Sequence, residues 1–63
     1  MTTRDKRQQM NHFLPRWGYR LNSRYGYYAI DAEDGYVIAT GLSFNEAWHV
    51  FLGISAVQNG VSP

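Results

Sequence analysis

The chain has no cysteine among its 63 residues, and this absence limits the available folds more than any other feature. A domain of this length buries only about 60% of the surface that its unfolded chain exposes, so its stability is marginal. Small domains usually compensate with disulfides, a structural metal or a partner subunit. Disulfides and thiolate metal sites both require cysteine. We therefore expect a single hydrophobic core whose stability is supplemented by contact with a partner.

The charges are unevenly distributed along the chain. Residues 1–24 hold all six basic residues and one acid, Asp5, which gives a net charge of +5, whereas residues 25–63 hold four acids and no lysine or arginine. Such asymmetry is typical of a basic arm that binds nucleic acid, or of two halves that partly neutralise each other in the fold. Residues 1–14 lack the apolar run of a secretory signal, and no segment approaches the roughly 18 apolar residues of a membrane span. We expect a cytoplasmic protein.

The N-terminal segment is predicted to be a flexible basic arm over residues 1–14. Residues 1–9 are polar and show no periodicity. Met10, Phe13 and Leu14 recur at the i, i+3, i+4 spacing of a helix, which predicts one or two helical turns that end at Pro15. The remaining residues, 15–63, are expected to form the single folded domain.

Residues 17–40 have the pattern of an antiparallel sheet of two to three strands. The segments 25–30 and 36–40 are rich in aromatic and β-branched residues, which suit a half-buried pleated surface. Between them, Asp34 and Gly35 favour a hairpin turn at residues 32–35, because glycine readily adopts the left-handed conformation that closes such a turn. The alternating run 17–21 can add a third strand, followed by a turn at Asn22 and Ser23.

The C-terminal segment is predicted to be an α-helix over about residues 43–58. Ser43 and Glu46 have the spacing of a capping box, and Asn59-Gly60 is a common helix stop. The fold is therefore α+β, with the helix packed on the sheet. The residues expected in its core are Tyr28, Ile30, Leu42, Phe44, Ala47, Trp48, Phe51 and Ile54.

The apolar arc of this helix is wider than one small sheet can cover. Val50 and Val57 extend it on one side and Leu52 on the other, whereas packing on a sheet requires a stripe of about 100° or somewhat more. Either the N-terminal segment or a second molecule must cover the excess. We favour a second molecule, either a partner protein or another copy of this chain, because residues 10–14 show only weak periodicity.

The sequence offers little to support catalysis or metal binding. His12 and His49 are the only histidines and lie on different elements. The acids of the hairpin, Asp31, Glu33 and Asp34, do not have the spacing of a calcium-binding loop. The serines have no neighbouring base. We expect no catalytic residue, no metal, no cofactor and no small-molecule substrate.

The layout of three short strands followed by a helix, residues 17–57, resembles the sheet-plus-helix DNA-binding modules at the N-terminus of some phage integrases. The resemblance implies DNA contact through the sheet, but strands 25–30 and 36–40 contain no basic residue where those modules carry several. The isoelectric point of about 8.1 is also below the value of roughly 9 that is typical of nucleic-acid-binding domains. The residues that would contact nucleic acid are Arg4, Lys6, Arg7, Arg16, Arg20 and Arg24.

Two features favour protein binding as the function. A strand places alternate side chains on opposite faces, so Tyr25 and Tyr27 should point outward while Tyr28 joins the core. Together with the excess apolar arc of the helix, these tyrosines predict an interaction surface. We expect a non-catalytic accessory or regulatory factor, of the kind that phages and other mobile elements encode, with nucleic-acid binding as the alternative. The predicted partner-binding residues are Tyr25, Tyr27, Val50, Leu52 and Val57.

Overall fold

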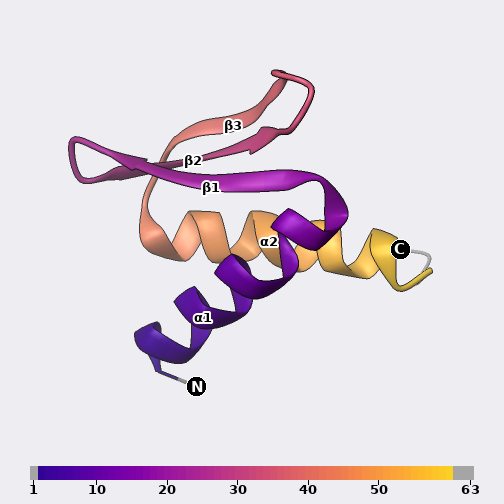
Figure 1. Ribbon diagram of the computed structural model, residues 1–63. Helices are drawn as coiled ribbons and strands as arrows, with labels where there is room; N and C mark the ends of the chain where they lie inside the picture. Colours follow the sequence, from indigo (N-terminus) through magenta and orange to yellow (C-terminus); the bar gives the residue numbers. More distant parts are fainter. Residues whose placement is uncertain (1, 61–63) are drawn as a thin grey trace.

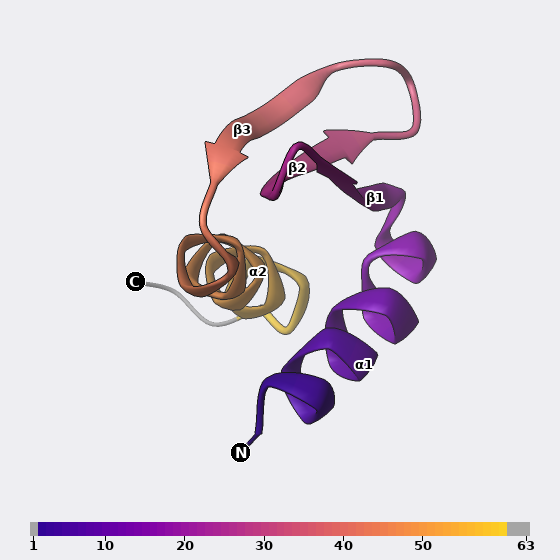
Figure 2. The ribbon, with the colours of Figure 1, turned by 90° about the vertical axis from the view of Figure 1, so that its left-hand side faces the viewer.

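The computed structural model describes residues 2–60, and it places two helices on the same side of a three-stranded antiparallel sheet (Figures 1 and 2). The strand order in the sheet is β1-β2-β3, so β1 and β3 are its edges. The predicted α+β fold with a C-terminal helix is confirmed. The elements are α1 (Thr3–Phe13), the 3-10 helix η1 (Pro15–Trp17), β1 (Tyr19–Arg24), β2 (Tyr27–Ala32), β3 (Val37–Leu42) and α2 (Phe44–Gln58).

The turn between β2 and β3 is the hairpin that the sequence predicts at residues 32–35. The Gly35 N–H donates a hydrogen bond of 3.1 Å to the Ala32 carbonyl, and the Ala32 N–H donates one of 2.8 Å to the Tyr36 carbonyl. Gly35 has φ +99°, which glycine adopts without the steric cost that a side chain would impose. The hairpin is therefore closed by hydrogen bonds and backbone preferences within residues 32–36.

The first strand lies further along the chain than the sequence predicts. Trp17 belongs to η1, β1 begins at Tyr19, and the predicted turn residues Asn22 and Ser23 lie inside β1. Pro15 starts η1, and the Trp17 ring stacks on Phe51 with centroids 5.8 Å apart, so a core contact holds this residue out of the sheet. The turn forms instead at positions 25 and 26, after Arg24 has ended β1, and both turn residues have positive φ.

The prediction of a flexible N-terminal arm is wrong, because residues 3–13 form α1. A capping box starts this helix: the Asp5 N–H donates to the Thr2 hydroxyl at 3.2 Å, and the Thr2 N–H donates to the Asp5 carboxylate at 3.4 Å. The predicted helical turns at residues 10–14 are the last part of α1, and they end before Pro15 as expected. Met10 and Leu14 are fully buried, so a few contacts on one face hold a helix whose other face is polar.

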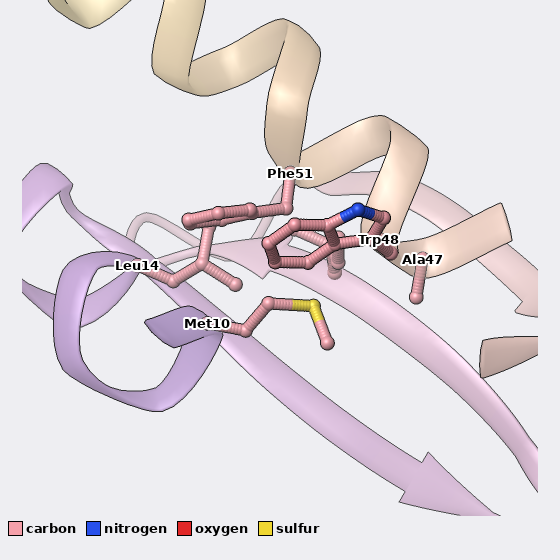
Figure 3. Packing of buried hydrophobic residues seen from close by; sticks show 6 residues of the cluster. Met10, Leu14, Ala47, Trp48 and Phe51 are labelled. Carbon is pink, nitrogen blue, oxygen red and sulfur yellow. The ribbon is translucent and has the colours of Figure 1, made fainter. Parts of the chain in front are cut away.

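The core lies between the sheet and the two helices. Figure 3 shows how Met10 and Leu14 of the N-terminal segment meet Trp48 and Phe51 of α2. Ile30 of β2 is also fully buried. Four of the eight predicted core residues, Ile30, Ala47, Trp48 and Phe51, are buried, and the other four pack against them half-buried: Tyr28, Leu42, Phe44 and Ile54.

Helix α2 begins and ends where the sequence predicts. The Glu46 N–H donates to the Ser43 hydroxyl at 3.2 Å, and the Ser43 N–H donates to the Glu46 carboxylate at 2.9 Å, which completes the capping box. The hydrogen bond from the Ser43 backbone, with a smaller contribution from its hydroxyl, lowers the pKa of Glu46. Gly60, with φ +73°, lies just beyond the C-cap residue Asn59.

Candidate functional site

The face of the sheet that points away from the helices is an uncovered surface that carries aromatic and arginine side chains. The register between β1 and β2 pairs Arg20 with Asp31, Asn22 with Ala29 and Arg24 with Tyr27. Their side chains share one face, because side chains alternate along a strand. Both helices lie on the opposite side (Figure 2). We call this surface the outer face, and define it by Arg20, Asn22, Arg24, Tyr27, Ala29, Asp31 and Val37.

The outer face is hollowed next to the turn between β1 and β2. A shallow groove of about 390 Å³ is lined there by aromatic and apolar residues together with the polar residues Asn22, Arg24, Asp31 and Thr40. Tyr27 is 59% exposed and Val37 62%. The Asn22 amide donates a hydrogen bond to the Asp31 carboxylate and so links the polar groups of β1 and β2. Aromatic residues and arginine are enriched at protein interfaces, whereas aspartate is depleted from them.

Tyr25 occupies an unfavourable backbone conformation at the edge of this groove. Its φ is +54°, and it is the only non-glycine residue with positive φ in the described part of the chain. Two-residue hairpin turns of this kind favour asparagine or aspartate followed by glycine, and Gly26 meets the second requirement. Tyr25 is also 93% exposed. Tyr25 and Tyr27 are both exposed, as predicted, but Tyr25 lies in the turn and not in a strand, because β2 begins at Tyr27 and not at residue 25.

The six basic residues do not gather on one surface. Arg20 and Arg24 lie on the outer face. The Lys6 ammonium lies 5.5 Å from the centroid of the Trp48 ring, on the helix side of the molecule. The Arg7 guanidinium lies 5.8 Å from the Phe44 ring and donates a hydrogen bond of 3.1 Å to the Tyr28 hydroxyl. Arg4 and Arg16 are exposed on α1 and η1.

The three predicted partner residues of α2 lie in different surroundings. Val50 is half-buried against the core cluster. Leu52 is 42% exposed and lines a groove of about 310 Å³ between α1 and α2, together with Phe13 and Trp17. Val57 is 72% exposed. The N-terminal segment thus covers part of the wide apolar arc of α2 but leaves Leu52 and Val57 accessible.

Val37 is a residue of the outer face that the sequence reasoning missed. It stands opposite Asp31 in the pairing of β2 with β3. The β-branched run 36–40 identified the strand, but the register shifts in this pairing obscure which residues face outward. Alternation alone could not have assigned Val37 to the same face as Tyr27.

No other part of residues 2–60 offers a more specific site. Within this range no three histidine or acidic side chains cluster closely enough to hold a metal ion. None of the helices within residues 2–60 has both the length and the apolar character of a membrane span. Comparisons with protein-family models, with curated proteins and with solved structures found no match to the chain.

Proposed function

We propose that this chain is a non-catalytic, cytoplasmic protein-binding factor whose partner contacts the outer face of the sheet beside Tyr25 and Tyr27. The sequence predicts two binding surfaces, the sheet face beside the tyrosines and the excess apolar arc of α2, and this proposal selects the sheet face. Tyrosine and arginine are enriched among residues that dominate protein interfaces, and Arg24, Tyr25 and Tyr27 adjoin one groove. The apolar residues in the same groove, Ala29 and Val37, would supply the desolvated centre.

The observation that carries the proposal is the conformation of Tyr25. A left-handed backbone costs a residue with a side chain about 1–2 kcal/mol. The ring recovers little of this cost within the chain, because it is 93% exposed. Strained residues of this kind concentrate at functional sites. Contact with a partner would bury the ring and offset the cost.

Nucleic-acid binding is the weaker candidate, because few cations share a surface. The outer face carries Arg20 and Arg24 but also Asp31, which stands opposite Arg20. Lys6 and Arg7 lie over aromatic rings of α2, on the helix side. A duplex binder typically neutralises several phosphates, each of which contributes to its salt dependence. Two arginines on the outer face would neutralise few phosphates and would contribute little to the affinity for a duplex.

Affinity capture with matched variants tests the proposal. The immobilised protein would be exposed to a nuclease-treated lysate of the organism that encodes it, and the retained proteins would be quantified by mass spectrometry. We expect Tyr25→Asn and Tyr27→Ser to lose a protein that the wild type retains. Val57→Ser is the control, because it removes an apolar side chain of α2 whose exposed fraction, 72%, lies between those of Tyr27 and Tyr25.

Two outcomes would contradict the proposal. Retention of the same proteins by the wild type and by both tyrosine variants would exclude the outer face as the binding surface. Tight binding to nonspecific duplex DNA that weakens steeply between 50 and 200 mM salt, as counterion release requires, would favour nucleic acid instead.

A further inference from the structure

The two edges of the sheet differ in regularity. The pairing of β2 with β3 contains two register shifts, and such irregularities twist an edge and discourage further pairing. The pairing of β1 with β2 runs through six consecutive residue pairs without a shift, from Tyr19–Ala32 to Arg24–Tyr27. Strand β1 is therefore the edge whose geometry suits the addition of another strand.

The backbone groups of Leu21 and Ser23 point away from the sheet along this edge. The Glu33 N–H donates to the Gly18 carbonyl, whereas the Tyr19 N–H turns outward and donates to the Leu14 carbonyl at 2.8 Å. Backbone groups alternate in direction along a strand, so those of residues 21 and 23 point the same way as those of Tyr19. Within residues 2–60 no backbone hydrogen bond outside the sheet pairing uses either residue.

A groove between α1 and β1 lies beside these backbone groups. It has a volume of about 330 Å³, and Leu21 and Ser23 both line it. Every polar side chain that reaches it from this side of the sheet can donate a hydrogen bond, and none is a carboxylate; these side chains are Arg7, Asn11, Ser23 and Tyr28, whereas the Asn22 side chain lies on the outer face. Arg7 uses one donor on Tyr28, and a guanidinium has five. The groove therefore favours acceptor or anionic side chains.

The charges of β1 select the kind of strand that can be added. Arg20 and Arg24 are exposed on the outer side of this edge. A second copy of β1 that paired antiparallel about Asn22 would place each of these arginines opposite the other, and like charges directly opposite are destabilising. An acidic segment would meet opposite charges at the same positions. Charge complementarity thus favours a foreign acidic strand over self-pairing.

We propose that β1 accepts an extended acidic segment of a partner protein as a fourth strand, with hydrogen bonds to the backbones of Leu21 and Ser23. Acidic side chains of that segment stand opposite Arg20 and Arg24, and the intervening small polar side chains enter the groove beside Arg7. The inference rests on the proposed protein-binding function and names the partner's chemistry. Strand addition obtains affinity from main-chain hydrogen bonds and specificity from alternate side chains.

The test uses a labelled eight-residue peptide of alternating glutamate and threonine, with fluorescence anisotropy for affinity and amide hydrogen exchange by NMR for location. We expect binding to protect the amides of Leu21 and Ser23. Methylation of alternate peptide nitrogens should abolish binding, since it leaves the charges and removes main-chain donors. A lysine-for-glutamate peptide should not bind.

Three protein variants complete the test. Ser23→Pro removes an outward N–H that takes no part in the pairing with β2, a position where an edge strand tolerates proline. Arg24→Glu reverses a charge beside the added strand, and like-charge juxtaposition is strongly unfavourable. Each should weaken peptide binding at least about tenfold. Leu52→Ser, on α2, should leave it unchanged, and thermal melting of each variant checks folding.

The proposal is wrong if the folded wild type does not bind the glutamate peptide, or if the methylated peptide binds equally well. Equal affinity for a single-stranded oligothymidylate would show a nonspecific anion surface instead. The peptide result is separable from the lysate capture. A captured protein that depends on Tyr25, combined with no peptide binding, would refute strand addition and leave the proposed outer-face binding intact. Peptide binding, combined with no captured protein that depends on Tyr25, would support strand addition and refute the outer face as the binding surface.

Discussion

Replacing Met10 with alanine tests whether α1 is part of the folded core. The Met10 side chain is fully buried and packs in the cluster that contains Trp48 and Phe51. Truncation of a buried methionine to alanine costs about 2–5 kcal/mol, depending on how far the surroundings collapse. Helix α1 is held by one face and can move inward, so we expect a cost in the lower half of this range, about 2–3 kcal/mol.

This cost is large for a chain of 63 residues. Typical stabilities of 0.05–0.15 kcal/mol per residue give about 3–9 kcal/mol for the whole domain. Each kcal/mol shifts the melting temperature of so small a domain by about 4–8 °C, so Met10→Ala should lower Tm by roughly 10–20 °C. Alanine is the stronger helix former, which means that a loss of stability reports lost packing and not lost helix propensity.

Thermal and urea unfolding, followed by circular dichroism, provide the assay. Gln8→Ala is the matched control, because Gln8 is exposed on the same helix. A Met10→Ala protein that melts within about 2 °C of the wild type would refute the docking of α1. A lower slope of unfolding free energy against urea, with unchanged Tm, would show that α1 separates before the rest unfolds, since the slope scales with the surface exposed.

Three further predictions follow from local geometry. Ser43→Ala should lower stability by about 1 kcal/mol in urea unfolding, through loss of the α2 cap, and an unchanged midpoint would contradict that role. Because the pKa of Glu46 is lowered, its carboxylate stabilises the fold above the ordinary pKa of glutamate, and this stabilisation is lost as the pH falls through the lowered pKa. Glu46→Gln should therefore make the unfolding free energy less dependent on pH at acidic pH, and identical pH profiles for the variant and the wild type would refute this. Tyr25→Asn should raise stability by about 1 kcal/mol while it weakens partner binding, and a variant less stable than the wild type would show that the tyrosine ring supports the fold.

The elements that were predicted correctly are those specified by neighbouring residues. Asp34 and Gly35 define a turn through backbone preferences alone, and Ser43 and Glu46 cap a helix three residues apart. Tyr27 and Tyr28 fall on opposite faces because a strand alternates. None of these features requires a contact between distant parts of the chain.

The N-terminal helix shows the limit of such reasoning. Thr2 and Asp5 have the capping-box spacing that marks the start of α1. The periodicity of residues 3–9 is weak, because α1 is stabilised by a few contacts on one face. Lys6 lies over the Trp48 ring, and Met10 is buried in the same cluster as Trp48. Both contacts join residues about 40 positions apart, and local sequence patterns do not indicate such pairs.

The sequence by itself therefore determined the fold class, the hairpin between β2 and β3, the bounds of α2 and the outward direction of Tyr27, since each depends on local conformational preference or strand alternation. The tertiary structure alone decided the packing of α1 on α2, the division of the basic residues between two sides of the sheet, and the strained turn at Tyr25. These features depend on contacts between residues far apart in the chain, such as Trp17 with Phe51, whose formation is governed by how the whole core packs.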